Sequence, residues 1–226
     1  MAKALLARVF AASLLCASAQ AFSVGGGQPL TAALLVDELE IQERSDGSAQ
    51  AWDVAAMARR DLDSLWLVSE GRRSAGRADD HELRAYASRA VAPYWDLTLG
   101  WRGDLGPGPE RHWLAAGIHG TAPFHIDTEM TFFVGDEGRS GLRIKLAREL
   151  MVTQRWQLLP QLSANFHGHN DPARGVEAGL SDLEADVRLA YRVTPGVRPY
   201  IGLGWRRSYG DSEEGGQVMV GIRFWL

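Results

Sequence analysis

The sequence ends in Gln217-Val-Met-Val-Gly-Ile-Arg-Phe-Trp-Leu226, and this stretch decides the fold class. Every second residue from Val218 to Leu226 is apolar, and a period of two is typical of a β-strand. In a soluble sheet, so apolar and aromatic an edge strand would promote aggregation. A closed membrane barrel has no free edge and surrounds its apolar face with lipid. The stretch therefore predicts an all-β outer-membrane β-barrel, with a soluble β-sandwich as the alternative.

The first residues have the composition of a secretory signal peptide. Positive charges precede an apolar run over residues 9–15, and Ala19-Gln20-Ala21 is a small-x-small cleavage pattern. We expect residues 1–21 to be removed and residues 22–30 to form a flexible lead-in to a barrel over residues 31–226. Because Cys16 lies in the leader, the mature chain has neither disulfides nor a thiolate metal site.

Composition and motifs exclude several classes of protein. The mature chain has no apolar run near 20 residues, so transmembrane helices are not expected. A formal net charge of -4 argues against nucleic acid as a partner. The sequence contains no phosphate loop, dinucleotide fingerprint or zinc-protease motif. The candidate nucleophiles Ser163, Ser181 and Ser208 have no histidine at a convincing neighbouring position, so we predict that the protein is not an enzyme.

Twelve segments of the sequence read as strands, most of them about as long as a tilted membrane strand requires. They cover residues 31–44, 50–60, 64–72, 81–90, 94–104, 112–120, 124–135, 140–152, 156–167, 182–193, 198–209 and 216–226. The even-numbered connections are all tight turns, whereas the odd-numbered ones include every long loop rich in Gly, Asp and Pro. This alternation predicts an up-and-down barrel of Gram-negative outer-membrane type, with both termini in the periplasm and lipid around its wall.

The two faces of the better strands separate by polarity. In residues 124–135 the even positions from Phe124 to Val134 are apolar apart from one threonine, whereas the odd ones include His125, Asp127 and Glu129. A charge facing hydrocarbon is costly, so the charged face must line the lumen. We expect ion pairs to fill this lumen, because twelve strands leave little width. Arg148 falls on an apolar face, which predicts either a slipped register or a side chain that reaches to the interface.

Seven stretches, in order from about residue 31 to the end, carry a family resemblance. They are Ala51-Trp52-Asp53, Leu65-Trp66-Leu67-Val68-Ser69-Glu70-Gly71, Tyr94-Trp95-Asp96-Leu97, Leu105-Gly106-Pro107-Gly108-Pro109, Asn170-Asp171-Pro172-Ala173-Arg174-Gly175, Gly179-Leu180-Ser181-Asp182-Leu183-Glu184 and Arg198-Pro199-Tyr200-Ile201-Gly202-Leu203-Gly204-Trp205. As a set they resemble the copper resistance protein B family of outer-membrane proteins. The resemblance implies a membrane barrel, a role in copper tolerance, copper as bound cargo, and other periplasmic copper-resistance proteins as candidate partners. Members of the family often carry a Met- and His-rich segment before the barrel, but residues 22–30 contain neither residue type.

A candidate metal site lies at the periplasmic mouth. The turn Thr121-Ala122-Pro123 would place His119 and His125 opposite one another on the lumen face, where Cβ atoms are about 4.5–5.5 Å apart. The neighbouring strands would bring further donors roughly level with this pair, namely Asp96, Glu149 and Met151. Imidazole, thioether and carboxylate ligands suit copper in either oxidation state. A solvated polar mouth with a hydrogen-bonded histidine pair is the alternative.

A second candidate is the His167-Gly168-His169 pair at the outer end of a strand, which places two imidazoles on one face. A solvated polar loop is the alternative reading of this pair. For the whole protein two functions remain open. One is a copper-handling barrel, and the other is a structural or small-solute barrel whose charges only fill its interior.

Overall fold

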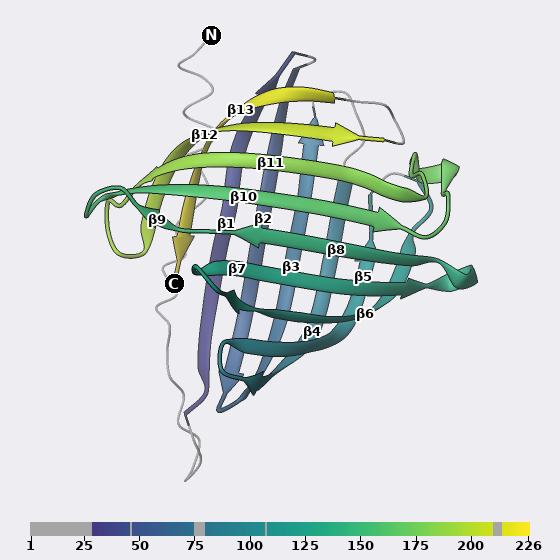
Figure 1. Ribbon diagram of the computed structural model, residues 1–226, viewed down its shortest axis with the longest axis horizontal. Helices are drawn as coiled ribbons and strands as arrows, with labels where there is room; N and C mark the ends of the chain where they lie inside the picture. The colour runs from purple at the N-terminus through teal and green to yellow at the C-terminus, as the bar shows by residue number, and fades with distance from the viewer. Residues whose placement is uncertain (1–28, 46, 75–79, 107, 210–213) are drawn as a thin grey trace.

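The computed structural model of the chain describes residues 29–45, 47–74, 80–106, 108–209 and 214–226 (Figure 1). The expected signal peptide, residues 1–21, and nearly all of the lead-in lie outside these residues. None of the helices formed by the described residues has the length and apolar character needed to cross a membrane.

The described residues fold into a closed antiparallel barrel of twelve strands, as the sequence predicts. The strands are β1 (Thr31–Arg44), β2 (Gly47–Arg60), β3 (Asp63–Ser74), β4 (Asp80–Ala92), β5 (Trp95–Asp104), β6 (Arg111–Ala122), β7 (Ile126–Gly135), β8 (Ser140–Ala147) continued by β9 (Leu150–Met151), β10 (Trp156–His167), β11 (Gly179–Tyr191), β12 (Val197–Ser208) and β13 (Glu214–Trp225). Two short 3₁₀ turns, η1 (Asp136–Gly138) and η2 (Pro172–Arg174), lie in the connections. Pairing of β1 with β13 closes the barrel, and in Figure 1 the near wall crosses the far wall, as tilted strands require.

The connections alternate as expected. Tight turns join β2 to β3, β4 to β5, β6 to β7, β9 to β10 and β11 to β12 at one end of the barrel, which we call the inner end. The longer connections, including residues 105–110 and 168–178, lie at the opposite, outer end. The start of β1 and the end of β13 both lie at the inner end as well.

The eighth strand of the barrel is interrupted because of a proline on its neighbour. Pro160 on β10 accepts a hydrogen bond from the Arg148 N–H at 3.1 Å but has no N–H to return. The backbone hydrogen-bond ladder with β10 is therefore interrupted at Arg148 and Glu149, between β8 and β9. The register is the same on both sides of the interruption, so the slipped register considered for Arg148 is wrong.

The hairpin between β6 and β7 turns later than the sequence predicts. Pro123 opens the turn, as prolines at the first central position of a turn do. Phe124 and His125 then adopt positive φ angles of 67° and 58°. The strand expected from Phe124 consequently begins at Ile126.

The apolar and charged faces lie as predicted. On β13, Val218 and Val220 are 52% and 58% exposed on the outer wall, whereas Gln217 and Met219 are 3% and 0% exposed. The outer wall of the other strands carries further exposed apolar side chains, such as Leu114 and Leu203. Polar and charged side chains fill the lumen, and the apolar side chains lie on the outer surface, as they do in barrels that face lipid.

A charge on the outer wall should impair assembly. Val220 lies in the middle of β13, and Val220→Arg should lower the free energy of unfolding in lipid by about 2–4 kcal/mol. Equilibrium refolding into lipid vesicles measures this loss. Ser163→Arg, which places the same charge in the lumen beside the outer cavity, is the control and should cost less. Equal losses for the two variants would contradict the face assignment.

Candidate functional site

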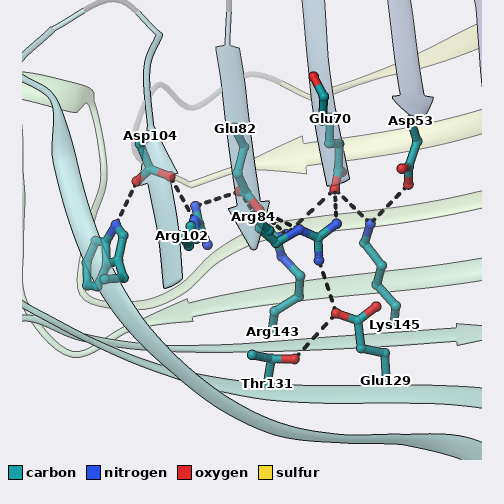
Figure 2. A network of polar contacts seen from close by, with 12 residues as sticks. Asp53, Glu70, Glu82, Arg84, Arg102, Asp104, Glu129, Thr131, Arg143 and Lys145 are labelled. Atoms are coloured by element: carbon teal, nitrogen blue, oxygen red, sulfur yellow. Dashed lines mark hydrogen bonds and ion pairs between the residues drawn. The ribbon is translucent and has the colours of Figure 1, made fainter. Parts of the chain in front are cut away.

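A connected network of charged side chains fills the lumen between β2 and β8 (Figure 2). Arg84 on β4 lies within 2.9 Å of Glu70, 3.1 Å of Glu82 and 3.1 Å of Glu129. Its side chain is 8% exposed, so these contacts replace nearly all of its water. The planar guanidinium carries five N–H donors, which allows one arginine to bind carboxylates from several strands at once.

Two cations on β8 extend this network. Arg143 binds Glu82 through two hydrogen bonds of 2.8 Å, and Lys145 lies 3.0 Å from Glu70 and 3.9 Å from Asp53 (Figure 2). Charged groups from β2, β3, β4, β7 and β8 thus neutralise one another across the lumen. The prediction that ion pairs fill the lumen is confirmed, and we call this network the ion-pair mesh.

A second buried cluster lies on the opposite wall around Arg188 of β11. Its guanidinium lies 2.9 Å from Glu38, 3.3 Å from Glu40 and 3.7 Å from Asp186. The Tyr200 hydroxyl donates a hydrogen bond of 2.8 Å to Glu40. Because the side chains of Glu40 and Asp186 are 0% and 2% exposed, the cluster depends on this arginine for its charge balance.

Cavities remain in the part of the lumen that the structure describes, among them a large inner one and a large outer one. The inner one has a volume of about 460 Å³ and the outer one about 870 Å³. Glu38, Lys145 and Gln161 line both cavities and therefore stand between them. The mesh divides the lumen into an inner and an outer cavity.

The inner cavity contains part of the first candidate metal site. Asp96 on β5 lies directly opposite His119 on β6, as expected, and Glu129 on β7 lies opposite His119 on its other side. His119 and Glu129 both line the cavity. Asp96 already accepts hydrogen bonds from Arg59 at 3.3 Å and Ser88 at 3.4 Å. The carboxylate of Asp96, the imidazole of His119 and the carboxylate of Glu129 thus lie on three neighbouring strands at the same level of the barrel.

The expected pairing of His119 with His125 is wrong. Because Pro123 opens the turn, the hairpin centre moves toward the C-terminus and His125 falls in the turn itself. The residue opposite His119 is Glu129.

The remaining expected ligands at the inner end have other partners. Glu149 lies 2.5 Å from Arg198 and 3.6 Å from Arg223, and the Met151 sulfur accepts a hydrogen bond of 2.9 Å from Gln157. Among the described residues, no group of three or more His, Cys, Asp or Glu side chains is placed to hold a metal ion. The structure thus brings Asp96 and His119 together and leaves His125, Glu149 and Met151 apart from them.

The second candidate pair lies at the outer mouth, where His167 and His169 both line the outer cavity. His167 is the last residue of β10, and its ring packs edge-on against Trp113, with 6.2 Å between ring centroids. Its Nδ1 lies 2.8 Å from the Ser181 hydroxyl, so the expectation that Ser181 has no histidine neighbour is wrong. His169 follows in the connection to β11.

Ion pairs between Asp171 and two arginines, Arg111 and Arg139, hold this connection against the barrel mouth, and we call them the latch. Asp171 accepts hydrogen bonds of 2.9 and 3.2 Å from Arg111 on β6 and lies 3.8 Å from Arg139. Further along the connection, Arg174 donates a hydrogen bond of 2.9 Å to the Pro109 carbonyl. The hydrogen bonds from Arg111 lower the pKa of the Asp171 carboxyl below its ordinary value of 3.8.

Removing the charge of Asp171 should loosen the connection. A lowered pKa in the folded protein means that the latch stabilises the loop fully above pH 3.8 and loses this effect as pH falls through the lowered pKa. We therefore expect Asp171→Asn to speed amide hydrogen exchange in residues 170–177 at pH 7, where the wild-type latch is intact. Glu177→Gln, in the same loop, is the matched control and should leave exchange unchanged. Equal protection in wild type and Asp171→Asn would contradict the latch.

Two residues of the outer mouth, Ser181 and Asp171, were not among the predicted site residues. The sequence gives one weak signal for Ser181, because the strict alternation of β11 from Asp182 onward does not continue through Leu180 and Ser181. The partner of Asp171 lies 60 residues away in sequence, so its role is visible only in the folded barrel.

The sequence profile of a family described as "Copper resistance protein B precursor (CopB)" matches residues 30–226. The chain belongs to the copper resistance protein B family. A copper resistance protein B homolog of Pseudomonas syringae pv. tomato is 40% identical over 202 residues, which cover 85% of this chain and 69% of the relative. Copper resistance protein B of Escherichia coli is 35% identical over 203 residues, with the same coverage of each chain, 85% and 69%. The family resemblance drawn from the sequence is confirmed.

Solved structures show the same fold in distant proteins. The NanC porin superposes with a TM-score of 0.60 at 12% identity and covers 84% of this chain and 99% of its own. The KdgM porin superposes with a TM-score of 0.56 at 11% identity and covers 85% and 98%. This copper resistance protein B family member thus has the closed antiparallel barrel fold of these porins.

Proposed function

We propose that this protein binds copper ions within its barrel and thereby contributes to copper tolerance at the outer membrane of a Gram-negative cell. The observation that supports the proposal is the family match, which spans residues 30–226 and hence the barrel itself. Copper is cargo in this proposal, and the role is not catalytic. Residues 1–21 would direct export and then be cleaved, which places the barrel in contact with outer-membrane lipid.

Two places in the lumen offer first ligands for the metal. At the inner end, Asp96 and His119 offer a carboxylate and an imidazole. At the outer end, His167 and His169 offer two imidazoles. Both donor types suit Cu(II). His125, Glu149 and Met151 would join the inner site only after leaving their present positions.

Copper bound in the barrel would reach or leave the protein by way of other periplasmic copper-resistance proteins at the inner end. The alternative is a structural or small-solute barrel without a specific metal site. It is favoured by the mutual neutralisation of the lumen charges, which by itself accounts for Arg84, Arg143, Lys145 and Arg188.

Two experiments test the proposal. The first is a copper titration of the barrel refolded in detergent, and the second measures the copper sensitivity of a deletion strain. We expect saturable binding and a strain that is more sensitive to copper, with tolerance restored by the wild-type gene. A refolded barrel that binds no copper, together with a deletion strain of unchanged sensitivity, would favour the alternative.

A further inference from the structure

We propose that His167 and His169 form a Cu(II) site at the outer mouth, in which Ser181 fixes the His167 ring so that its Nε2 atom binds the metal. The inference rests on the proposed copper binding and gives it a place, a ligand pair and an oxidation state. It is carried by an irregularity between β10 and β11, by one hydrogen-bond chain and by the composition of the outer cavity.

The irregularity is a β-bulge at Ser181. Asn165 pairs with Asp182 and Phe166 pairs with Leu180, so Ser181 is the extra residue of β11. A bulge of this kind redirects a side chain and is common next to functional sites. Here the Ser181 side chain is buried, with the residue 2% exposed, and its hydroxyl donates a hydrogen bond of 3.0 Å to the Asn165 carbonyl.

This hydrogen bond determines which nitrogen of His167 carries the proton. A serine hydroxyl has one hydrogen, and Ser181 gives it to Asn165. At the 2.8 Å contact between Ser181 and Nδ1 of His167, the ring must therefore be the donor. A neutral ring that donates from Nδ1 has its lone pair on Nε2, so Nε2 is the nitrogen that can bind a metal.

The Nε2 atom of His167 is available for a ligand. Among the hydrogen bonds made by the described residues, none goes to this atom. The ring lines the outer cavity, and Trp113 packs against it edge-on. The ring is thus oriented by contacts with Ser181 and Trp113 that leave its metal-binding nitrogen free.

The second ligand, His169, lies between two anchored residues. The Gly168 N–H donates to the Ser140 carbonyl at 2.8 Å, and the Asp171 N–H donates to the Val176 carbonyl at 2.8 Å. These contacts and the latch at Asp171 hold the backbone on both sides of His169. The two histidines are therefore kept at one side of the same mouth, and both line the same cavity.

The chemistry of the outer cavity favours Cu(II) over Cu(I). Among the described residues that line it, none is Met or Cys, the soft ligands that select Cu(I). Two imidazoles suit Cu(II), whose other positions would be filled by water from the cavity.

The experiment is a Cu(II) titration of the refolded full barrel, followed by electron paramagnetic resonance and by tryptophan fluorescence. Bound Cu(II) should show nitrogen couplings from imidazole and should quench Trp113, whose ring centroid lies 6.2 Å from that of His167. Trp113→Phe should lose a large part of this quenching.

The His167→Ala/His169→Ala variant should lose the nitrogen couplings and the saturable binding. His112→Ala, whose ring stacks on Trp101 away from the outer cavity, is the matched control. Ser181→Ala should weaken Cu(II) affinity about 10- to 100-fold, as loss of a group that orients a metal ligand does. Ser163→Ala, which removes another hydroxyl beside the same cavity, should leave affinity unchanged.

The outcomes separate this inference from the proposed function. Binding that survives in the double histidine variant would overturn the outer site but leave copper binding by the barrel intact. A folded wild-type barrel that binds no copper would overturn both. Equal losses in Ser181→Ala and Ser163→Ala would overturn the positioning role of Ser181.

Discussion

Replacing Arg188 by methionine should lower the free energy of unfolding by about 3–5 kcal/mol, because the variant leaves buried carboxylates without their shared cation. Glu40 and Asp186 are almost completely shielded from water, so neither can be solvated in place. Equilibrium unfolding in lipid vesicles measures the loss. Adding Glu40→Gln to the variant should recover part of it, since one uncompensated charge is then removed.

The control for this experiment is Arg89→Met on β4. Arg89 lies 3.5 Å from Asp63, but their side chains are 67% and 65% exposed, and such pairs contribute about 0–1 kcal/mol. The contrast therefore depends on burial and not on the loss of an arginine as such. A loss for Arg188→Met as small as that of the control would show that water enters the cluster freely.

Shortening Lys145 should connect the two cavities. Lys145 lines both of them and bridges Glu70 and Asp53, so Lys145→Ala opens space at the division and leaves the lumen more negative. We expect single-channel conductance in planar bilayers to rise severalfold and to favour cations more strongly. The physical reason is that a narrow passage lined by one sign of charge concentrates counter-ions.

Lys145→Arg is the matched variant, because it keeps both the charge and the bulk of the side chain. Its conductance should remain at the wild-type level. If wild type already conducts as well as Lys145→Ala, the mesh is not a barrier.

The architecture of the barrel could be predicted from the sequence because its causes are local. The alternation of apolar and polar residues around Val218 and Val220 indicates which residues lie on the outer face. The alternation of short and long connections indicates the direction of each strand. Both properties can be read within one strand or one loop. Strand number, face assignment and the ion-pair lumen follow from them.

The errors arose at two prolines, one in a turn and one on a neighbouring strand. The turn at Pro123 shifted the centre of its hairpin and with it the partner of His119. The interruption at Arg148 is caused by Pro160 on the neighbouring strand, which no inspection of β8 alone reveals.

The outer site shows the same limit. The H-x-H pair can be found in the sequence, but the role of Ser181 depends on a bulge in the pairing of β10 with β11. The latch between Asp171 and Arg111 joins residues that are 60 positions apart. Cross-strand pairing therefore decides which donors converge, and it has to be seen in the folded barrel.

The alternation of faces also matters before the barrel exists. An apolar segment of about 20 residues is retained by the inner membrane as a helix during secretion. Each strand here interrupts its apolar residues with lumen-facing polar ones, as Gln217 and Arg223 do on β13. In the export proposed above, these strands would thus pass through the inner membrane without being arrested there, and strand pairing would later bring their apolar side chains onto one surface.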